Sequence, residues 1–173
     1  MNIAIVGAHS ATKLRAPYDA HDWQIWSLSP KNENALPRCD VWFEMHKRFL
    51  TDPDADGKEY GGWLRGHPFV YMQEQSPLIL GSVAYPKNEM MAEFGSGFFT
   101  STLAWMMALA IARRPKMVGL WGVDRNATGE YRDQRPSCLF FAHIARTRGI
   151  EFIVPDGCAM LDPDILYGYD LDR

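Results

Sequence analysis

The stretch FFTSTLAWMMALAIARRPKMVGLWGVD (residues 98–124) decides the fold class. Its first part, 98–112, is apolar almost all round, which is typical of a helix buried against a sheet, and Pro115 prevents that helix from continuing. Its second part, 117–123, is a nearly continuous apolar run, as in a strand that is covered on both faces. We therefore predict a buried helix followed by a parallel strand whose carboxyl end meets a ligand-binding crevice.

Apolar runs on both sides of this unit extend the same pattern. We expect five more strands, at 2–6, 23–29, 40–45, 69–72 and 150–154. A second long helix is predicted over 136–148, with Pro136 in its first turn and Gly149 at its stop. Strands that alternate with helices predict an α/β fold, here a single Rossmann-like domain over 1–173 with a mainly parallel sheet flanked by helices.

Three segments lie outside this alternation. Residues 51–66 are dense in Asp and Gly and are expected to combine a loop with a short helix. Residues 73–97 hold three glycines and two prolines. Loops of that length are uncommon inside compact domains, so we interpret this segment as a lid or binding loop. The acidic tail, 162–173, is expected to pack on the surface.

Composition argues against several classes of function. The 173-residue chain has a net charge of −3 and no basic stripe, which disfavours nucleic-acid binding. No run approaches the roughly 18 apolar residues of a membrane span, and the first residues do not resemble a signal peptide. Three widely spaced cysteines fit a reducing compartment. We expect a cytoplasmic protein with neither nucleic-acid nor membrane partners, and the sequence indicates no oligomeric state.

The turn Gly7-Ala8-His9-Ser10 follows the first predicted strand. Main-chain N–H groups at such a turn, together with the helix dipole, favour an anion, so Gly7, His9 and Ser10 are candidate phosphate ligands. The alternative is an ordinary turn in which Ser10 caps the helix. The sequence has neither the glycine-rich dinucleotide fingerprint nor the P-loop motif.

Hydroxyl groups mark two further ends of predicted elements. Ser27 closes the second strand, where doubly wound folds commonly contact a ribose or a base, although a turn-forming serine explains the same position. Ser96 is expected to cap the long helix. Thr100 and Ser101 lie in the first turn of that helix, which is another anion-binding position.

Glu44 and His46 close the third predicted strand on one face, because side chains alternate across a strand. A carboxylate beside an imidazole suits a general acid or base with its orienting partner, or part of a metal site. A surface ion pair with Lys47 or Arg48 is the alternative.

Asp124 follows an apolar strand, so its charge is expected to lie at a site or to be paired. It could hold Mg²⁺ between phosphates or accept a hydrogen bond from a ligand hydroxyl. A capping role for the next turn is the structural alternative. No second carboxylate follows at close spacing, so no dedicated metal site is predicted.

A polar cluster follows Asp124 and contains Glu130, Tyr131, Gln134 and Arg135. The arginine offers a fork for phosphate or carboxylate, and the tyrosine and glutamine suit the polar edges of a ligand. The alternative is a solvated loop and helix start.

Several runs resemble a family of small uncharacterised proteins of bacteriophage and prophage genomes. These runs are Tyr85-Pro86, Phe94-Gly95, 99–105, 120–124 and the block Glu130-Tyr131-x-x-Gln134-Arg135-Pro136-Ser137. The glycine turn, the helix near Ser96 and the strand ending in Gly-x-Asp are more distantly similar to MptE-like pyrophosphokinases. The strand-end pattern is also similar to that in the cores of one class of bacterial sialyltransferases. The resemblance implies a nucleotide-handling ancestry, in the host cytoplasm if the protein is phage-encoded.

These observations lead to one hypothesis and two rivals. We expect a protein that binds a nucleotide or nucleotide-sugar, a phosphorylated small molecule, and transfers part of it to an acceptor. Ser10, Ser96 and Arg135 would hold phosphate, Asp124 would take Mg²⁺ or a hydroxyl, and His46 or Glu44 would be the acid or base. The rivals are a non-catalytic module that sequesters a nucleotide, and a nucleotide hydrolase in which water replaces the acceptor.

Overall fold

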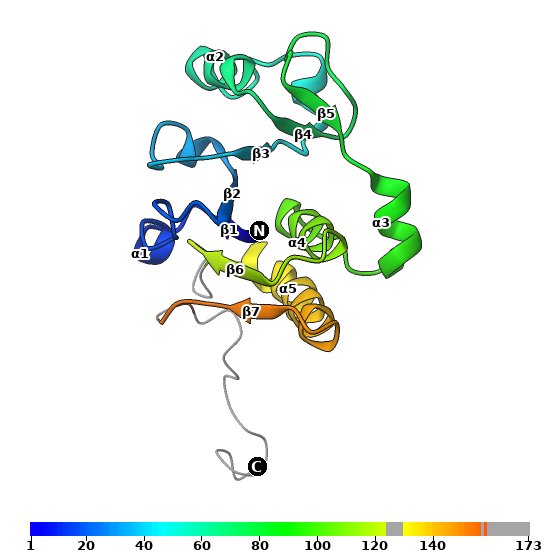
Figure 1. Cartoon of the computed structure of the whole chain (residues 1–173). Helices are drawn as coiled ribbons and strands as arrows, with labels where there is room; N and C mark the ends of the chain where they lie inside the picture. The colour runs from blue at the N-terminus through cyan, green and yellow to red at the C-terminus, as the bar shows by residue number, and fades with distance from the viewer. Residues whose placement is uncertain (124–129, 157, 159–173) are drawn as a thin grey trace, which may run out of the picture.

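Seven parallel strands form one sheet within residues 1–123, 130–156 and 158, which are the residues that the computed structural model describes (Figure 1). The order is β5-β4-β3-β2-β1-β6-β7, and the labels follow it down the picture. The strands are β1 (Asn2–Val6), β2 (Trp23–Leu28), β3 (Val41–Phe43), β4 (Val70–Met72), β5 (Ser82–Ala84), β6 (Met117–Trp121) and β7 (Glu151–Ile153). The expected α/β fold with a parallel sheet flanked by helices is confirmed.

Helices connect most of these strands. They are α1 (Ser10–Lys13), α2 (Lys58–Gly66), α3 (Lys87–Phe94), α4 (Thr102–Ala112) and α5 (Glu130–Thr147), with short 3-10 helices η1 (Pro30–Asn32) and η2 (Lys47–Leu50). In the described part of the chain, no helix combines the length and the apolar character that crossing a membrane requires.

The order of the strands reverses at β1. The chain builds outward from β1 to β5, passes through α4, and returns to the other side of β1 as β6. Ala4 in β1 consequently lies between Ile25 of β2 and Gly119 of β6. Ligands of open parallel sheets bind at such a reversal, beyond the carboxyl ends of the strands.

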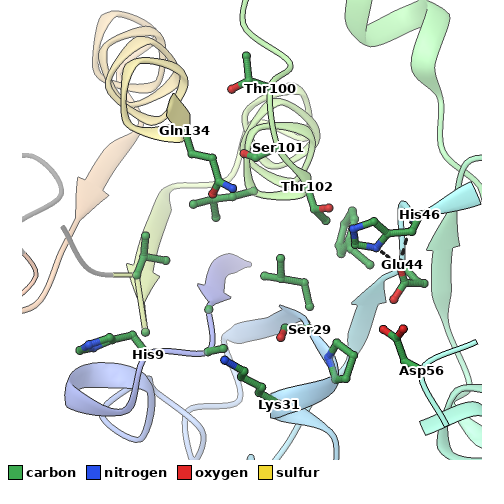
Figure 2. Close-up of a pocket in the computed structure, with 18 of the residues that line it drawn as sticks. His9, Ser29, Lys31, Glu44, His46, Asp56, Thr100, Ser101, Thr102 and Gln134 are labelled. Carbon is green, nitrogen blue, oxygen red and sulfur yellow. Dashed lines mark hydrogen bonds and ion pairs between the residues drawn. The ribbon is translucent and has the colours of Figure 1, made fainter. Parts of the chain in front are cut away.

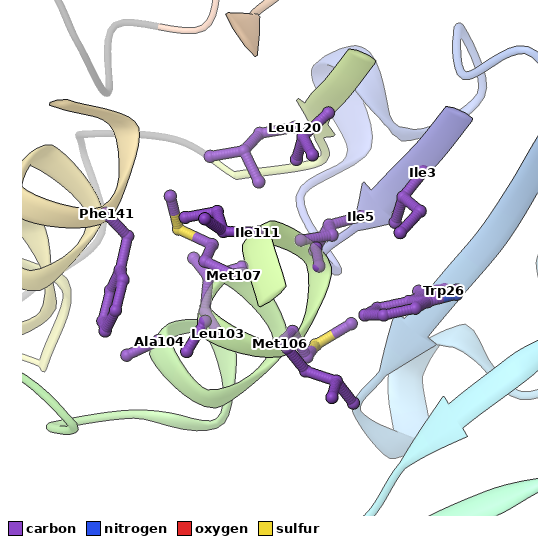
Figure 3. Packing of buried hydrophobic residues seen from close by; sticks show 14 of the residues in the cluster. Ile3, Ile5, Trp26, Leu103, Ala104, Met106, Met107, Ile111, Leu120 and Phe141 are labelled. Carbon is purple, nitrogen blue, oxygen red and sulfur yellow. The ribbon is translucent and has the colours of Figure 1, made fainter. Parts of the chain in front are cut away.

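Helix α4 forms the apolar centre of one face of the sheet. Its buried residues are Leu103, Ala104, Met106, Met107, Ala108, Leu109, Ala110 and Ile111. They belong to one cluster with Ile3 and Ile5 of β1 and with Phe141 of α5, and Figure 3 shows α4 between them. A helix covered on two sides has no polar stripe, which explains the nearly uniform apolar sequence of this segment.

Aromatic residues dominate the opposite face beside β3. Trp42 is fully buried and packs with Tyr60 and Leu64 of α2. Because side chains alternate along a strand, Glu44 emerges two residues later on the same face as Trp42. The strand thereby carries a carboxylate from this aromatic cluster to the edge of the sheet.

Two of the expected helix starts are wrong. Helix α4 begins at Thr102, and the Oγ of Ser101, rather than Ser96, caps it by accepting a hydrogen bond from the N–H of Ala104 at 3.1 Å. Ser96 is exposed, five residues before that cap. Helix α5 begins at Glu130, so Pro136 lies inside the helix rather than in its first turn.

The segment 73–97 contains regular structure, because β5 and α3 both fall within it. The short helix expected within 51–66 is α2. The cysteines Cys39, Cys138 and Cys158 form no disulfide with one another.

Candidate functional site

A cavity of about 780 Å³ opens at the carboxyl ends of β1, β2, β3 and β6 (Figure 2). The start of α4 lies across the cavity from the turns that follow β1 and β2. A volume of this size lies within the range of small-molecule binding sites. The cavity therefore occupies the place where the reversed strand order predicts a ligand.

Two glycines bring the ends of β1 and β6 together in the wall of the cavity. A Cβ on Gly7 would lie 2.4 Å from the oxygen of Gly122, and one on Gly122 would lie 2.3 Å from the oxygen of Gly7. The N–H of Gly7 donates to Trp121 O at 2.7 Å, and the N–H of His9 donates to Gly122 O at 2.8 Å. These two N–H groups hold the strands together, so a phosphate at this turn would have to use other donors.

His9, rather than Ser10, caps the short helix α1. Its Nδ1 accepts from the N–H of Ala11 at 3.4 Å. Ser10 is the first residue of α1, is exposed and lines the cavity. The hydroxyl of Ser10 thus stands at the cavity without a capping role.

Ser27 ties β1 to β2 inside the protein. It is fully buried, and its hydroxyl donates to Val6 O at 2.8 Å and accepts from Asn32 Nδ2 at 3.0 Å. Ser27 does not line the cavity, whereas Ser29 and Lys31 do. Ser29 holds an unusual φ of +80°, a conformation that costs energy in a non-glycine residue and that clusters at functional sites.

The start of α4 lines the cavity. Thr100, Ser101, Thr102 and Leu103 line it, and Ser101 satisfies the N–H of Ala104. The first N–H groups of a helix have no partners within the helix, and the dipole adds partial positive charge there. This expected anion position is therefore part of the cavity, with Ser101 in place and Ser96 outside the lining.

Glu44 and His46 form the most defined chemical group of the site. The Oε1 of Glu44 lies 2.6 Å from His46 Nδ1 and accepts from the N–H of His46 at 3.1 Å. The Glu44 side chain is 2% exposed, whereas that of His46 is 59% exposed and lines the cavity. This is the arrangement of an imidazole oriented by a buried carboxylate.

Glu44 controls the protonation of His46. The hydrogen bond from His46 to Glu44 and the charge of that carboxylate raise the pKa of His46 above its usual value, against the opposing effect of partial burial. An imidazole with a raised pKa is a stronger proton acceptor. The side chain is therefore suited to taking a proton from a ligand in the cavity.

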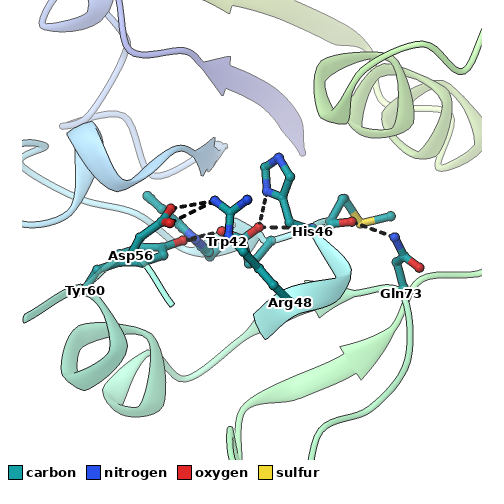
Figure 4. A network of polar contacts seen from close by, with 8 residues as sticks. Trp42, His46, Arg48, Asp56, Tyr60 and Gln73 are labelled. Carbon is teal, nitrogen blue, oxygen red and sulfur yellow. Dashed lines mark hydrogen bonds and ion pairs between the residues drawn. The ribbon is translucent and has the colours of Figure 1, made fainter. Parts of the chain in front are cut away.

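Two neighbouring pairs complete this wall (Figure 4). Tyr60 donates to Glu44 Oε2 at 2.6 Å and accepts from Trp42 Nε1 at 3.0 Å. Arg48 donates to both oxygens of Asp56, at 2.9 and 2.8 Å. Arg48, one of the two basic residues named in the surface ion-pair alternative, therefore pairs with Asp56 rather than with Glu44.

The remaining predicted residues lie near α5. Gln134 lines the cavity, whereas Arg135 is half-buried and outside the lining. Glu130 and Tyr131 begin α5, and their side chains lie outside what the structure describes, as do Asp124 and the tail 162–173. Within the described ranges, no three His, Cys, Asp or Glu side chains group as metal ligands.

The sequence interpretation missed Lys31, Asp56 and Tyr60. Lys31 follows β2 directly after Pro30, a position that the strand pattern alone indicates as facing the site. Tyr60 reaches Glu44 from α2, sixteen residues away, and no local pattern in the sequence marks that contact.

No family model and no curated protein matches this sequence. Solved structures share its fold. The sialyltransferase CstII from Campylobacter jejuni, in complex with the substrate analogue CMP-3FNeuAc, is 13% identical, with a TM-score of 0.56 over 91% of this chain and 80% of that one. Sialyltransferase CST-II with a trisaccharide acceptor and CMP is 13% identical, with a TM-score of 0.57 over 96% and 89%.

Thiamine pyrophosphokinase from Bacillus subtilis is also similar, at 12% identity and a TM-score of 0.52. The match covers 90% of this chain and 60% of that enzyme. The expected likeness to sialyltransferase and pyrophosphokinase cores is confirmed at the level of fold. Membership of the phage family stays a prediction.

Proposed function

We propose that this protein binds a nucleotide or nucleotide-sugar in the cavity and transfers part of it to an acceptor. The position of the cavity supports the binding step, because it lies where the strand order reverses around β1. The structural neighbours support the same class, since their names describe a sialyltransferase and a pyrophosphokinase. Fold alone does not carry function, so the proposal depends on the side chains of the site.

One side of the cavity suits phosphate. The N-terminal turn of α4 offers main-chain N–H groups and partial positive charge, and Ser101 and Thr102 add hydroxyls. Lys31 lies across the cavity from that turn, and Ser10 lines the same cavity. A phosphate between them would have donors on both sides, and charge that develops on a leaving phosphate would be stabilised there.

The other side suits proton transfer, and the Glu44–His46 pair is the observation that carries the proposal. With its Nδ1–H directed at Glu44, neutral His46 keeps a lone pair on Nε2. Nε2 takes the proton of the acceptor hydroxyl while the oxygen of that hydroxyl forms a bond to the transferred group. The bond from that group to the nucleotide phosphate oxygen breaks, and Glu44 stabilises the imidazolium that results.

Other predicted residues enter the proposal from the sequence alone. Asp124 is proposed to hold Mg²⁺ or a ligand hydroxyl, and Glu130, Tyr131 and Arg135 are proposed to contact the ligand. Chelation separates the two roles of Asp124. Activity that disappears with EDTA and in Asp124→Asn supports the metal, whereas weaker binding in Asp124→Asn without metal dependence supports the hydroxyl.

The test combines binding with turnover. The full chain is titrated by calorimetry with CMP, UMP, GMP and AMP, and nucleotide release from sugar conjugates of the base that binds is then followed. His46→Gln is expected to keep nucleotide binding and to lose about 10²- to 10⁴-fold in release. The control is His21→Gln, because His21 is exposed and does not line the cavity.

Each result decides between the proposal and its rivals. Absence of binding by all four nucleotides contradicts the proposal. Tight binding without release under any acceptor supports the sequestering module. Release at the same rate with and without an acceptor supports the hydrolase.

A further inference from the structure

The carboxylate of Glu44 has donors on both of its oxygens. Oε1 faces the N–H and Nδ1 of His46, at 3.1 and 2.6 Å, and Oε2 accepts from Tyr60 at 2.6 Å. Glu44 and Tyr60 are each 2% exposed, and Trp42 behind them is fully buried. Such a carboxylate is held by its hydrogen bonds rather than by solvent, and each donor affects how much charge the other oxygen carries.

The direction of these hydrogen bonds follows from the chemistry of the groups. An indole N–H is only a donor, so the oxygen of Tyr60 accepts from Trp42, at 3.0 Å, and directs its own proton to Glu44. An ionised Glu44 is only an acceptor, so the ring of His46 must place its proton on Nδ1. Burial and the charge of Glu44 raise the pKa of Tyr60 well above its usual range, so this phenol stays a donor.

We infer that Tyr60 is a positioning residue for His46: it holds Glu44 Oε2, leaves Oε1 for the imidazole, and moderates the proton affinity of His46 through Glu44. The part that concerns turnover depends on the proposed function. The effect on the titration of His46 does not.

The position of Tyr60 in the fold supports this role. It reaches Glu44 from α2, which packs on the face of the sheet that carries Trp42. Its ring contacts Phe49 edge-on at 5.4 Å and lies 6.3 Å from the ring of Trp42, between centroids. The hydroxyl is thus fixed by packing, and Glu44 receives it in one orientation.

The experiment is an NMR titration of His46 in Tyr60→Phe, with the signal assigned by its loss in His46→Gln. Without the phenol proton, more negative charge stays on Oε1, so the pKa of His46 is expected to rise by about half a pH unit. In Glu44→Gln it should fall instead, because the anion is gone. A pKa of His46 that is unchanged or lowered in a folded Tyr60→Phe protein overturns the inference.

Two comparisons separate this role from a general loss of packing. Tyr85 is also buried and donates to a main-chain oxygen, that of Trp105, at 2.7 Å, so Tyr85→Phe loses a similar bond and should leave the titration of His46 unchanged. In the Glu44→Gln background, Tyr60→Phe should add no further shift, since Tyr60 acts through Glu44. An equal shift in both backgrounds contradicts the inference.

The turnover measurement tests the proposed function apart from Tyr60. If the wild-type protein releases nucleotide, the acid limb of its pH–rate profile should move to higher pH in Tyr60→Phe, following the pKa of His46. If there is no turnover but the NMR shift is present, the transferase proposal fails and the role of Tyr60 stands. If the wild-type protein turns over but Tyr60→Phe leaves the titration of His46 unchanged, the transferase proposal stands and the role of Tyr60 fails.

Discussion

His46 and His67 lie at two ends of the same aromatic cluster, and their surroundings differ in exposure and in hydrogen-bond partner. The ring of His67 lies 6.2 Å from that of Trp42 and 4.9 Å from that of Trp63, between centroids. His67 is 8% exposed, and among the described residues its Nε2 has no hydrogen-bond partner. His46 is more exposed and has a buried carboxylate beside it.

This difference reverses the effect of the protein on the imidazole. Burial lowers the pKa of His67, and its hydrogen bond to Phe69 only partly opposes that effect. The hydrogen bond to Glu44 raises the pKa of His46. The proton-transfer role proposed above therefore falls to His46 rather than to the buried histidine. Burial lowers the pKa of His67, and a carboxylate partner raises that of His46.

Replacement of Trp42 should have the largest effect on stability. Its ring lies beside that of His67, and its indole N–H donates to Tyr60, the residue that bonds Glu44. Trp42→Ala leaves a cavity in the cluster and takes the donor from Tyr60, so we expect a loss of about 3–5 kcal/mol in the free energy of unfolding. Urea denaturation measures it. The control is Trp23→Ala, which removes a half-buried tryptophan outside this cluster and should cost clearly less. Equal losses in the free energy of unfolding of the two variants would contradict a central role of Trp42 in this cluster.

Replacement of the carboxylate should remove the distinction between the two histidines. In Glu44→Gln, His46 loses the anion that raises its pKa, and the nucleotide release proposed above should fall about 10²-fold, at the low end of acid–base contributions. The measurement is kcat against pH, with nucleotide affinity followed separately. A fall in affinity alone, at constant kcat, would place Glu44 in ligand binding instead.

Acid should destabilise the protein through His67. Its folded pKa lies below the unfolded value of about 6.5, so its contribution to stability is present above that pH and is lost as the pH falls through the folded pKa. By pH 5 we expect the wild-type protein to lose about 1 kcal/mol in the free energy of unfolding relative to His67→Phe, whose side chain does not titrate. Denaturation curves of both proteins at pH 5, 6.5 and 8 provide the comparison. If the free energies of unfolding of the two proteins changed with pH in the same way, this role of His67 would be contradicted.

The smallest effect should come from His46 and have the opposite sign. Its folded pKa lies above about 6.5, so its contribution is fully present below that value and is lost as the pH rises through the folded pKa. Because the side chain is 59% exposed, solvent screens the pair, and we expect no more than about 0.5 kcal/mol between wild type and His46→Gln. That difference should be larger at pH 5.5 than at pH 9.

The sequence predicts the parts of this architecture that depend on local pattern. Apolar runs mark six of the strands, and the predicted pairing of Glu44 with His46 is observed just beyond the end of β3. β5 was missed because its sequence, Ser82-Val83-Ala84, offers no continuous or alternating apolar run, and two of its three residues are exposed. Ser96 and Ser101 are both hydroxyls before the apolar run, and the backbone geometry that selects Ser101 is not visible in the sequence.

Contacts between distant segments set the limit of such predictions. The bond from Tyr60 to Glu44 depends on how α2 packs over β3, which no spacing encodes. Ser27 was a candidate ligand group at a strand end, with a turn-forming serine as the alternative, and its buried hydroxyl donates to Val6 O of the neighbouring strand. Whether the residues from Asp124 to Arg135 contact a ligand stays a prediction.

The close approach of Gly7 and Gly122 also bears on how such a protein can diverge. At this place the site is built of main chain, and each glycine excludes a side chain on the other because the Cβ would lie 2.4 Å or less from a carbonyl oxygen. The requirement on both positions is the absence of a side chain, whatever stands around them. Descendants could therefore replace most of the surrounding wall and change ligand while this junction between the two strands persists.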